Sequence, residues 1–559
     1  MRSPVAFAEN HQTPPLQGSA SFLAPKYIAA LLVLISSITF YEFRSSTFIG
    51  DGLRHLPALR TVTEGPPVAF QPKPWLEVYR AHYDRVVVHN HFLFGLTIRA
   101  AFALQQALGI RGDAIVAIQL VNAISAAIAG GLFFFLVLRL GVSTGISLAV
   151  TMGLCLSPVY LIAATNVTEV ALALPFFLGT LLVLADREFL GRRAVLAGIL
   201  VGLAAITYLL AGSLVPCIAI AVVVSRCSSG SIRTAFLFLS VFALVFLGIW
   251  IVVLYLSGVH GPTSLAIAIL KFPQQGTYGG FKLGSLVATP IGLTQAFFPI
   301  LPDDFRGLRS LYHQTPVVAL VAGILSLITC AMLARAIYLL SKRRSIYNVA
   351  LLSSVLTLLL VQAACVEWDP YYSKLQVFAL ILFWLTVAVG FAGSQSDEAH
   401  RWFLLLFVTA VAAGGVRVLR TNIQPSQTNK NAQQLHAIVR EGVLITGWSS
   451  DVAHLWLYSN GDNIIPLPDF AFARNLQPSR VEADLDAVIK KATADGTNVY
   501  FYGVFDADDA DLTNVYEARF RLTGFTSYLR GLQQDARPVG RFVQPGGHWS
   551  VLYVYNGKV

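Results

Sequence analysis

Long apolar stretches constrain the fold of this chain more than any other feature. A transmembrane helix needs about 20 predominantly apolar residues, because the hydrocarbon core of a bilayer is about 30 Å thick. Such stretches lie at 27–43, 114–138, 144–163, 168–185, 194–210, 212–225, 234–257, 315–340, 347–366, 374–393 and 402–419. With 55% of its residues hydrophobic and 13% charged, the chain has more apolar surface than globular folding can remove from water. The sequence therefore predicts a polytopic α-helical membrane protein with about 11 transmembrane helices.

Basic residues orient the predicted helices, because Lys and Arg collect in the short cytoplasmic loops of membrane proteins. If 92–108 lies along the membrane instead of crossing it, Arg139, the DREFLGRR turn and the SKRRS turn all fall on one side. The turns near Thr165 and Gly212 and the EWDPYY turn then fall on the other side, and they contain no Lys or Arg. We therefore expect 92–108 to form an interfacial helix on the outer surface.

This orientation gives the predicted organisation of the chain. An odd number of spans and a cytoplasmic N-terminus describe a multi-pass protein of a bacterial inner (cytoplasmic) membrane whose C-terminal part is periplasmic. Beyond the last span, the runs GVLITGW, NVYFYGVF and HWSVLYVY are strand-like, and VEADLDAVIKKATADG is helical up to Gly496, which predicts an α/β domain. The predicted segments are a cytoplasmic tail (1–26), a transmembrane domain (27–420) with outer loops 44–113 and 258–314, a polar linker (421–435) and the periplasmic α/β domain (436–559).

Charge and cysteine usage exclude several classes of function. The net charge of +10 is typical of cytoplasmic loops that meet anionic lipid headgroups, so nucleic-acid binding is not predicted. The five cysteines lie in or beside apolar runs and have no CxxC spacing, which predicts neither a disulfide framework nor a metal site.

Unusual polar residues gather at the outer ends of the predicted helices and in the outer loops. The candidate site residues are Asp51, Arg54, His55, His89, Asn90, His91, Glu169, Tyr208, Glu367 and Asp369. Glu169 lies in the first turn of a span, where a carboxylate costs several kcal/mol unless it faces water or a partner. The alternative for Glu169 is that it offsets the positive N-terminal end of its helix.

The other candidates also have ordinary alternatives. Asp51 lies between Gly50 and Gly52, which is typical of a plain turn as well as of a catalytic loop. Glu367 and Asp369 lie in a turn where solvated carboxylates are common. The pair His89 and His91 has the spacing of two metal ligands, but no third ligand follows at a recognisable distance. We therefore expect no cofactor, with a divalent metal as the alternative.

Four segments carry a resemblance to a known family. They are HNHFLFGLTIRAAFAL (89–104), LVNAISA (120–126), LSPVYLIAATNVTEVALAL (156–174) and GLAAITYLLAGSLVP (202–216). Together they resemble the GT-C superfamily of membrane glycosyltransferases, in particular the bacterial relatives of the protein O-mannosyltransferases, over residues 27 to 225. The family usually has a second acid in its first outer loop and prolines after the histidine. This chain has Leu53 and Arg54 after its acidic position and no such prolines.

The resemblance implies a GT-C-like fold and transfer of a sugar from a polyprenyl-phosphate donor to an envelope acceptor, which is a glycolipid, a polysaccharide or a protein. The site would lie where the bilayer meets the periplasm, with Asp51 as the general base that accepts the acceptor's hydroxyl proton. Arg54, His55, His89 and His91 are candidates to stabilise the leaving phosphate. Two alternatives stay open: a non-catalytic scaffold or sensor with a periplasmic binding domain, and a transporter. The transporter is disfavoured because no charged residue lies near the middle of a predicted span.

Overall fold

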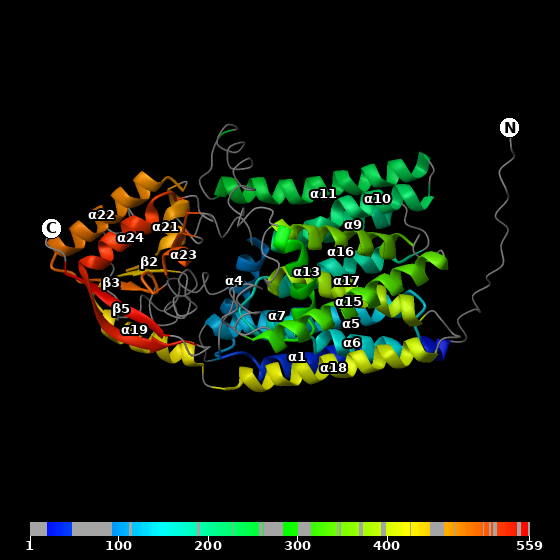
Figure 1. Ribbon diagram of the computed structural model, residues 1–559. Helices are drawn as coiled ribbons and strands as arrows, with labels where there is room; N and C mark the ends of the chain where they lie inside the picture. The colour runs from blue at the N-terminus through cyan, green and yellow to red at the C-terminus, as the bar shows by residue number, and fades with distance from the viewer. Residues whose placement is uncertain are drawn as a thin grey trace.

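A helical bundle and a smaller α/β domain beyond one of its ends make up the structure (Figure 1). The computed structural model describes residues 19–46, 92–110, 114–186, 191–226, 229–256, 261, 283–299, 315–343, 345, 348–367, 373–392, 398–424, 426–447, 463–474, 476–506, 508–513, 516–517, 522–544 and 549–556. The bundle consists of α1 (Ser19–Glu42), α4 (Phe92–Ala107), α5 (Ala114–Arg139), α6 (Thr144–Cys155), α7 (Pro158–Thr165), α8 (Val170–Leu184), α9 (Arg192–Thr207), η3 (Leu209–Ser213), α10 (Leu214–Arg226), α11 (Ser229–Leu256), α13 (Leu283–Gln295), α15 (Pro316–Lys342), α16 (Val349–Glu367), α17 (Ser373–Ala392) and α18 (Glu398–Asn422).

Each predicted apolar stretch lies on one of these helices or on a helix pair. Among the described residues, six helices are long and apolar enough to cross a membrane, and seven if the bent pair α6 and α7 counts as one span. This pair bends by 65° just before Pro158, which has no N–H group to continue the hydrogen bonds of α6. The helical membrane architecture is confirmed, and the number of crossings stays a prediction.

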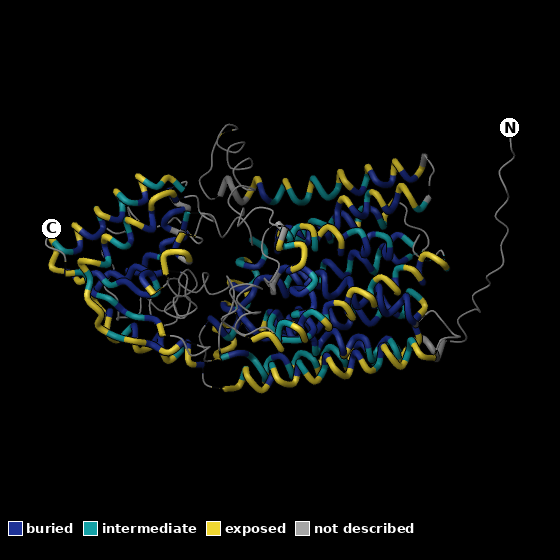
Figure 2. Tube along the Cα trace, in the orientation of Figure 1, coloured by how far each residue is buried: buried dark blue, intermediate teal, exposed yellow. Residues whose placement is uncertain are grey.

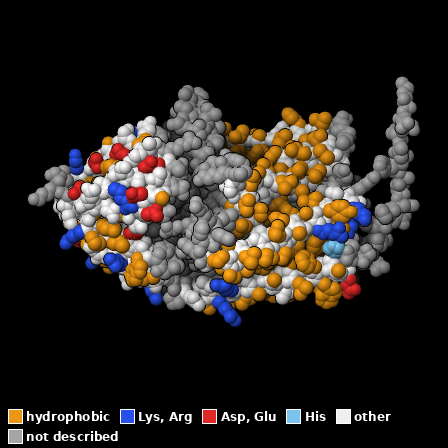
Figure 3. Space-filling view, in the orientation of Figure 1, with side chains coloured by type: hydrophobic (Ala, Val, Ile, Leu, Met, Phe, Trp, Pro, Cys, Tyr) orange, Lys and Arg blue, Asp and Glu red, His pale blue; other side chains and the backbone are white. Residues whose placement is uncertain are grey.

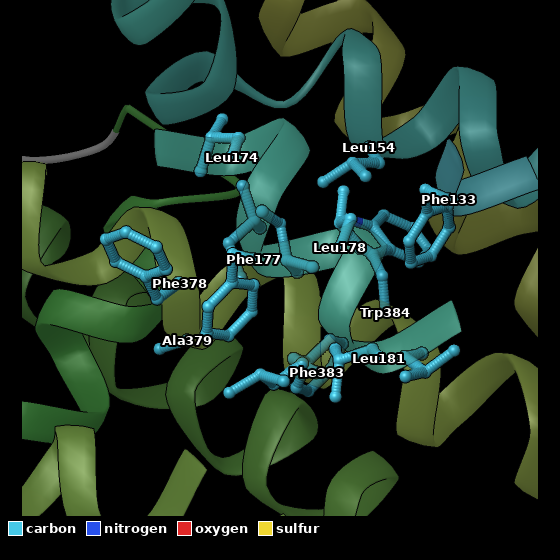
Figure 4. Packing of buried hydrophobic residues seen from close by; sticks show 14 of the residues in the cluster. Phe133, Leu154, Leu174, Phe177, Leu178, Leu181, Phe378, Ala379, Phe383 and Trp384 are labelled. Carbon is cyan, nitrogen blue, oxygen red and sulfur yellow. The ribbon is translucent and has the colours of Figure 1, made fainter. Parts of the chain in front are cut away.

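The centre of the bundle is α17, which is apolar on all sides and buried from Leu375 to Phe391. Trp384 is fully buried, and its indole N–H donates to the Ser157 hydroxyl at 3.2 Å beside the bend between α6 and α7. Figure 4 shows Trp384 and Phe383 on α17 facing side chains of α8. The outer surfaces of the bundle are exposed and apolar, as at Leu327, which is typical of surfaces that face lipid (Figures 2 and 3).

Helix α4 confirms the helix predicted at 92–108. Phe94, Ile98 and Phe102 recur every four residues and are buried against Ile115 and Ile118 of α5. This apolar stripe explains why a segment that carries Arg99 and two glutamines packs as a helix. Its placement along the membrane surface remains a prediction.

The C-terminal domain is built on a five-stranded sheet with the order β2-β1-β3-β5-β4. Strands β2, β1 and β3 are parallel, whereas β5 pairs antiparallel with both β3 and β4. Buried residues of α19, such as Leu435, cover one face, and those of α22 and α24 cover the other. The elements are α19 (Gln427–Val439), β1 (Val443–Thr446), β2 (Ile464–Pro466), α21 (Leu467–Ala473), α22 (Pro478–Ala494), β3 (Val499–Tyr502), α23 (Asp509–Leu512), α24 (Phe525–Gln534), β4 (Ala536–Val543) and β5 (Trp549–Tyr555).

This domain confirms the predicted α/β class and corrects one segment. The three predicted strands correspond to β1, β3 and β5, and the predicted helix corresponds to α22, which is followed by Gly496 with φ +68°. The segment 421–435, expected to be a polar linker, instead contains most of α19. The segment has few apolar residues, but two of them, Ala432 and Leu435, lie on one helix face and are fully buried against the sheet. The predicted domain boundaries remain untested.

Candidate functional site

Two of the predicted site residues, Glu169 and Tyr208, have side chains that the structure describes. Glu367 is described as the last residue of α16, without its side chain. The remaining predicted site residues lie outside the described residues: Asp51, Arg54, His55, His89, Asn90, His91 and Asp369.

Glu169 is a buried carboxylate at the start of α8. Its side chain is 1% exposed, and its neighbours Thr165, Asn166 and Thr168 are also buried. Although it occupies the N-cap position of α8, its side chain makes no capping hydrogen bond to the first turn of the helix. The helix dipole still favours a negative charge here, but capping does not explain why this residue is a glutamate.

Tyr208 lies at the same end of the bundle, because α8 begins where the neighbouring antiparallel helix α9 ends. Its backbone is extended (φ −153°, ψ 112°), which ends α9 and leads into the short helix η3. The ring stacks on Phe378 of α17 at 5.8 Å between centroids, and Phe378 in turn contacts Phe177 of α8. Tyr208 is therefore fixed in position by aromatic packing at the end of the bundle that faces the C-terminal domain (Figure 1).

Five polar residues join four distant segments at this end, and we call Ser45, Ser46, Gln119, Thr165 and Asn422 the anchor cluster. The backbone N–H of Ser45 donates to the carbonyl of Thr165 at 3.0 Å. The backbone N–H of Ser46 donates to the carbonyl of Asn422 at 3.1 Å. Gln119 of α5 donates from Nε2 to the carbonyl of Ser45 at 3.0 Å and lies 3.4 Å from that of Thr165.

The side chain of Asn422 completes these contacts. Its Nδ2 group donates to the hydroxyl oxygen of Thr165 at 3.0 Å and to the carbonyl of Phe43 at 3.1 Å. The hydroxyl of Ser46 donates to the carbonyl of Gln424, just past the end of α18, at 2.5 Å. The end of α7 and the end of α18 are therefore held to the end of α1 and to the first residues of the predicted outer loop 44–113.

Asn122 holds the turn that precedes Glu169. Its Nδ2 group donates to the carbonyl of Asn166 at 2.8 Å and to that of Thr168 at 2.7 Å. Asn122 is fully buried in α5, so both carbonyls depend on this carboxamide for a donor in place of water. Asn122 therefore fixes the backbone from which the Glu169 side chain projects.

Sequence reasoning missed Gln119, Asn122 and Asn422 as site residues, although a signal was present. Gln119 and Asn122 lie one turn apart in an otherwise apolar span, and polar residues inside a membrane helix generally have a structural or functional partner. Asn422 lies in a polar stretch, where an asparagine is unremarkable by pattern alone. Within the part of the chain that the structure describes, no group of three His, Cys, Asp or Glu residues could hold a metal ion.

Comparison with known proteins shows which folds this architecture resembles. No protein-family model and no curated protein sequence matches the chain. Its fold is similar to that of ArnT from Cupriavidus metallidurans bound to undecaprenyl phosphate, with a TM-score of 0.52 and 11% identity over 96% of this chain and 98% of ArnT. The apo form of ArnT gives a TM-score of 0.55 and 12% identity over 95% of this chain and 98% of ArnT.

A third structure extends the comparison to an archaeal enzyme. The apo oligosaccharyltransferase of Archaeoglobus fulgidus has a TM-score of 0.50 and 13% identity over 95% of this chain and 75% of its own. These likenesses cover both the helical bundle and the C-terminal domain, at identities that establish the fold alone. The chain has the fold of the GT-C superfamily of membrane glycosyltransferases, which confirms the fold class predicted from its sequence.

Proposed function

We propose that this protein is a membrane glycosyltransferase that moves a sugar from a polyprenyl-phosphate donor to an envelope acceptor. The observation that carries the proposal is the likeness in fold to ArnT, which extends over nearly the whole of both chains and includes a structure with undecaprenyl phosphate bound. The polar framework at one end of the bundle supports it, because a lipid-linked sugar presents its sugar at a membrane boundary.

In the proposed reaction, an acceptor hydroxyl oxygen forms a bond to the anomeric carbon of the donor sugar. Asp51 accepts the hydroxyl proton, and the bond between the anomeric carbon and the phosphate oxygen breaks. Polyprenyl phosphate leaves with the electron pair of that bond. Cationic and imidazole groups stabilise the charge on the leaving phosphate, and the proposed groups are Arg54, His55, His89 and His91.

The anchor cluster supports the role given to Asp51. Asp51 is the fifth residue after Ser46, a reach of at most about 18 Å. Ser46 is bonded to the end of α18, and Ser45 is bonded to Thr165, four residues before Glu169. This reach is compatible with the proposal that Asp51 acts at the same end of the bundle as the buried carboxylate of Glu169.

The remaining proposed site residues would bind substrate. Glu169 and Tyr208 are held rigidly enough to position sugar hydroxyls, and Asn90, Glu367 and Asp369 are assigned to substrate binding from the sequence. The acceptor is a glycolipid, polysaccharide or protein of the envelope. We propose a bacterial inner-membrane location with the N-terminus in the cytoplasm, which puts this site and the C-terminal domain in the periplasm.

The sugar composition of envelope glycolipids and glycoproteins tests this proposal. We expect a sugar to disappear from cells that lack the protein and to return with the intact chain. Asp51→Asn, inserted in the membrane at the same level, should not restore it. Full restoration by Asp51→Asn would refute the assignment of the base, and an unchanged composition in the deletion strain would favour the non-catalytic scaffold.

A further inference from the structure

The end of the bundle opposite the C-terminal domain is strongly basic. Among the described residues at this end, the two carboxylates are Asp186 and Glu398. Asp186 forms ion pairs with Arg139, at the end of α5, and with Arg193, in the first turn of α9, where its second oxygen lies 2.8 Å from Nη2. The charges of these three residues are therefore largely satisfied within the bundle. Other basic residues of this end remain, among them Arg233 of α11 and the basic residues of α15 and α18.

These remaining residues meet over the last turn of α17. Arg335 of α15 donates from Nε to Nε2 of His400 of α18 at 3.3 Å, and the His400 ring contacts Phe391 of α17 at 5.1 Å. Arg343 donates to the carbonyl of Gly390 at 3.2 Å. α15 and α17 approach closely here, since a Cβ atom at Gly390 would lie 2.8 Å from that of Ala336. In Figure 3, Lys and Arg side chains gather beside a His at this end of the visible face.

Arg335 keeps hydrogen-bonding capacity that the protein does not use. Within the described parts of the chain, no carboxylate lies within ion-pair distance of Arg335, and its Nε is the one nitrogen with an acceptor. Its guanidinium also lies 5.4 Å from the centroid of the Tyr338 ring. The side chain is exposed, so its two terminal NH2 groups are available to a ligand. Two parallel N–H groups of this kind match the geometry of a phosphate.

The surroundings of Arg335 indicate the depth at which such a phosphate would lie. Tyr338, whose ring contacts the guanidinium of Arg335, is 54% exposed, and Trp402, which donates to the carboxylate of Glu398 in the first turn of α18, is 60% exposed. Tyr and Trp are enriched at the level of lipid headgroups. Lys342 lies on the same face of α15 as Arg335 and Tyr338, two turns further along, and is exposed as well.

We infer that Arg335, His400 and Lys342 form a binding site for the headgroup of an anionic phospholipid. Arg335 holds the phosphodiester through its two terminal NH2 groups, His400 fixes the orientation of the guanidinium, and Lys342 supplies a second positive charge. The apolar flanks of α15 and α18 face the acyl chains. This site lies at the opposite end of the bundle from the proposed transfer site and does not depend on the proposed function.

Native mass spectrometry of the purified full-length chain tests this site. Binding of phosphatidylglycerol is compared with that of phosphatidylcholine of the same acyl chains, for the intact chain and for Arg335→Gln. We expect Arg335→Gln to weaken phosphatidylglycerol binding by roughly tenfold and to leave phosphatidylcholine binding unchanged. Arg335→Lys should give an intermediate value, because it keeps the charge and loses the two-pronged contact.

Arg233→Gln is the matched control, because Arg233 is an exposed arginine of α11 at the same end of the bundle. Equal losses in Arg335→Gln and Arg233→Gln would show that binding follows total charge alone and would overturn the site. Displacement of the lipid by millimolar inorganic phosphate would overturn it too, since the ligand would then be a free anion. Lys342→Gln, at the exposed end of α15, gives a second test if Arg335→Gln does not fold, and an unchanged affinity would refute its role.

Discussion

Asn422 donates a hydrogen bond from Nδ2 to the hydroxyl oxygen of Thr165 at 3.0 Å, although the two residues are 257 positions apart. The same group donates to the carbonyl of Phe43 at 3.1 Å. One carboxamide at the end of α18 therefore binds the ends of α1 and α7. Since α19 of the C-terminal domain begins five residues later, this contact also links that domain to the start of the first outer loop.

Asn422→Ala should therefore impair transfer more than it impairs folding. The substitution removes both side-chain donations, at a cost of about 1–3 kcal/mol in the free energy of unfolding. Because Phe43 at the end of α1 and Thr165 at the end of α7 lose the donor that they share, we expect the rate of sugar transfer to fall by at least about tenfold. The rate of sugar transfer by the purified full-length Asn422→Ala variant is compared with that of the intact chain. Thr421→Ala is the control, because the exposed Thr421 hydroxyl bonds within α18 alone, to the carbonyl of Arg417; equal effects would contradict the role of Asn422.

Asn122→Asp should be more harmful than Asn122→Ala. An aspartate places negative oxygens against the carbonyls of Asn166 and Thr168, which now accept from Nδ2 at 2.8 and 2.7 Å, whereas alanine removes the donor without adding charge. We expect alanine to lower the free energy of unfolding by about 1–3 kcal/mol and aspartate by more. Thermal unfolding in detergent compares the two. Ser125→Ala, at a buried serine of the same helix, provides the baseline, and an aspartate variant as stable as the intact protein would refute the assignment.

Gly415→Ala should strongly destabilise the bundle. A Cβ atom at Gly415 of α18 would overlap the carbonyl oxygen of Leu156, at the bend between α6 and α7, and this backbone cannot move without displacing Trp384 and its contact with Ser157. Overpacking of this kind costs about 1–3 kcal/mol or more. Gly248→Ala of α11 meets nothing within 4 Å and should be neutral or slightly stabilising. Melting temperatures of the two variants measure the difference, and equal values would show that α18 does not pack closely against the bend.

The C-terminal domain should lose stability in acid. Burial lowers the pKa of His436 in α19 below its ordinary value of 6.5, and the nearby charge of Arg440 lowers this pKa further. The unfolded chain then binds a proton more readily than the folded chain, so this contribution is present above pH 6.5 and is lost as the pH falls towards the folded pKa. Unfolding of the full-length chain, followed at pH values on both sides of 6.5, measures this contribution of His436 to the stability of the C-terminal domain. His436→Gln should reduce the pH dependence, and an unaltered dependence would contradict this cause.

The bundle was predictable because an apolar stretch long enough to cross a membrane predicts a helix by itself. Each of these stretches lies on a helix or on a helix pair. Strands β1, β3 and β5 were predictable for a similar reason, since each carries buried apolar residues. Strand β4 was missed because it is an edge strand, largely exposed and containing Pro538. Strand β2 was missed because its three residues are too few to show a pattern.

The candidate site was less predictable, because its framework depends on long-range contacts. Glu169 was identified from its own position, since a carboxylate at the start of an apolar helix is unusual by itself. Asn422 could not be identified in this way, because its role arises from contacts with Phe43 and Thr165, in other parts of the sequence. A single sequence does not reveal which polar residues of different helices meet.

Transfer by the purified protein tests the central claim most directly. The full-length chain is reconstituted in lipid vesicles with polyprenyl-phosphate sugars as donors and an extract of the native envelope as the source of acceptor, and the release of polyprenyl phosphate is measured. Two substitutions that each remove a carboxylate, Asp51→Asn and Glu169→Gln, are compared with Glu42→Gln, which neutralises an exposed glutamate at the end of α1. We predict release by the intact chain and by Glu42→Gln, a loss of at least about a hundredfold in Asp51→Asn, whose base is removed, and a smaller loss in Glu169→Gln, which is proposed to position the sugar. Undiminished release by Asp51→Asn, or no release by the intact chain with any donor fraction, would contradict the account.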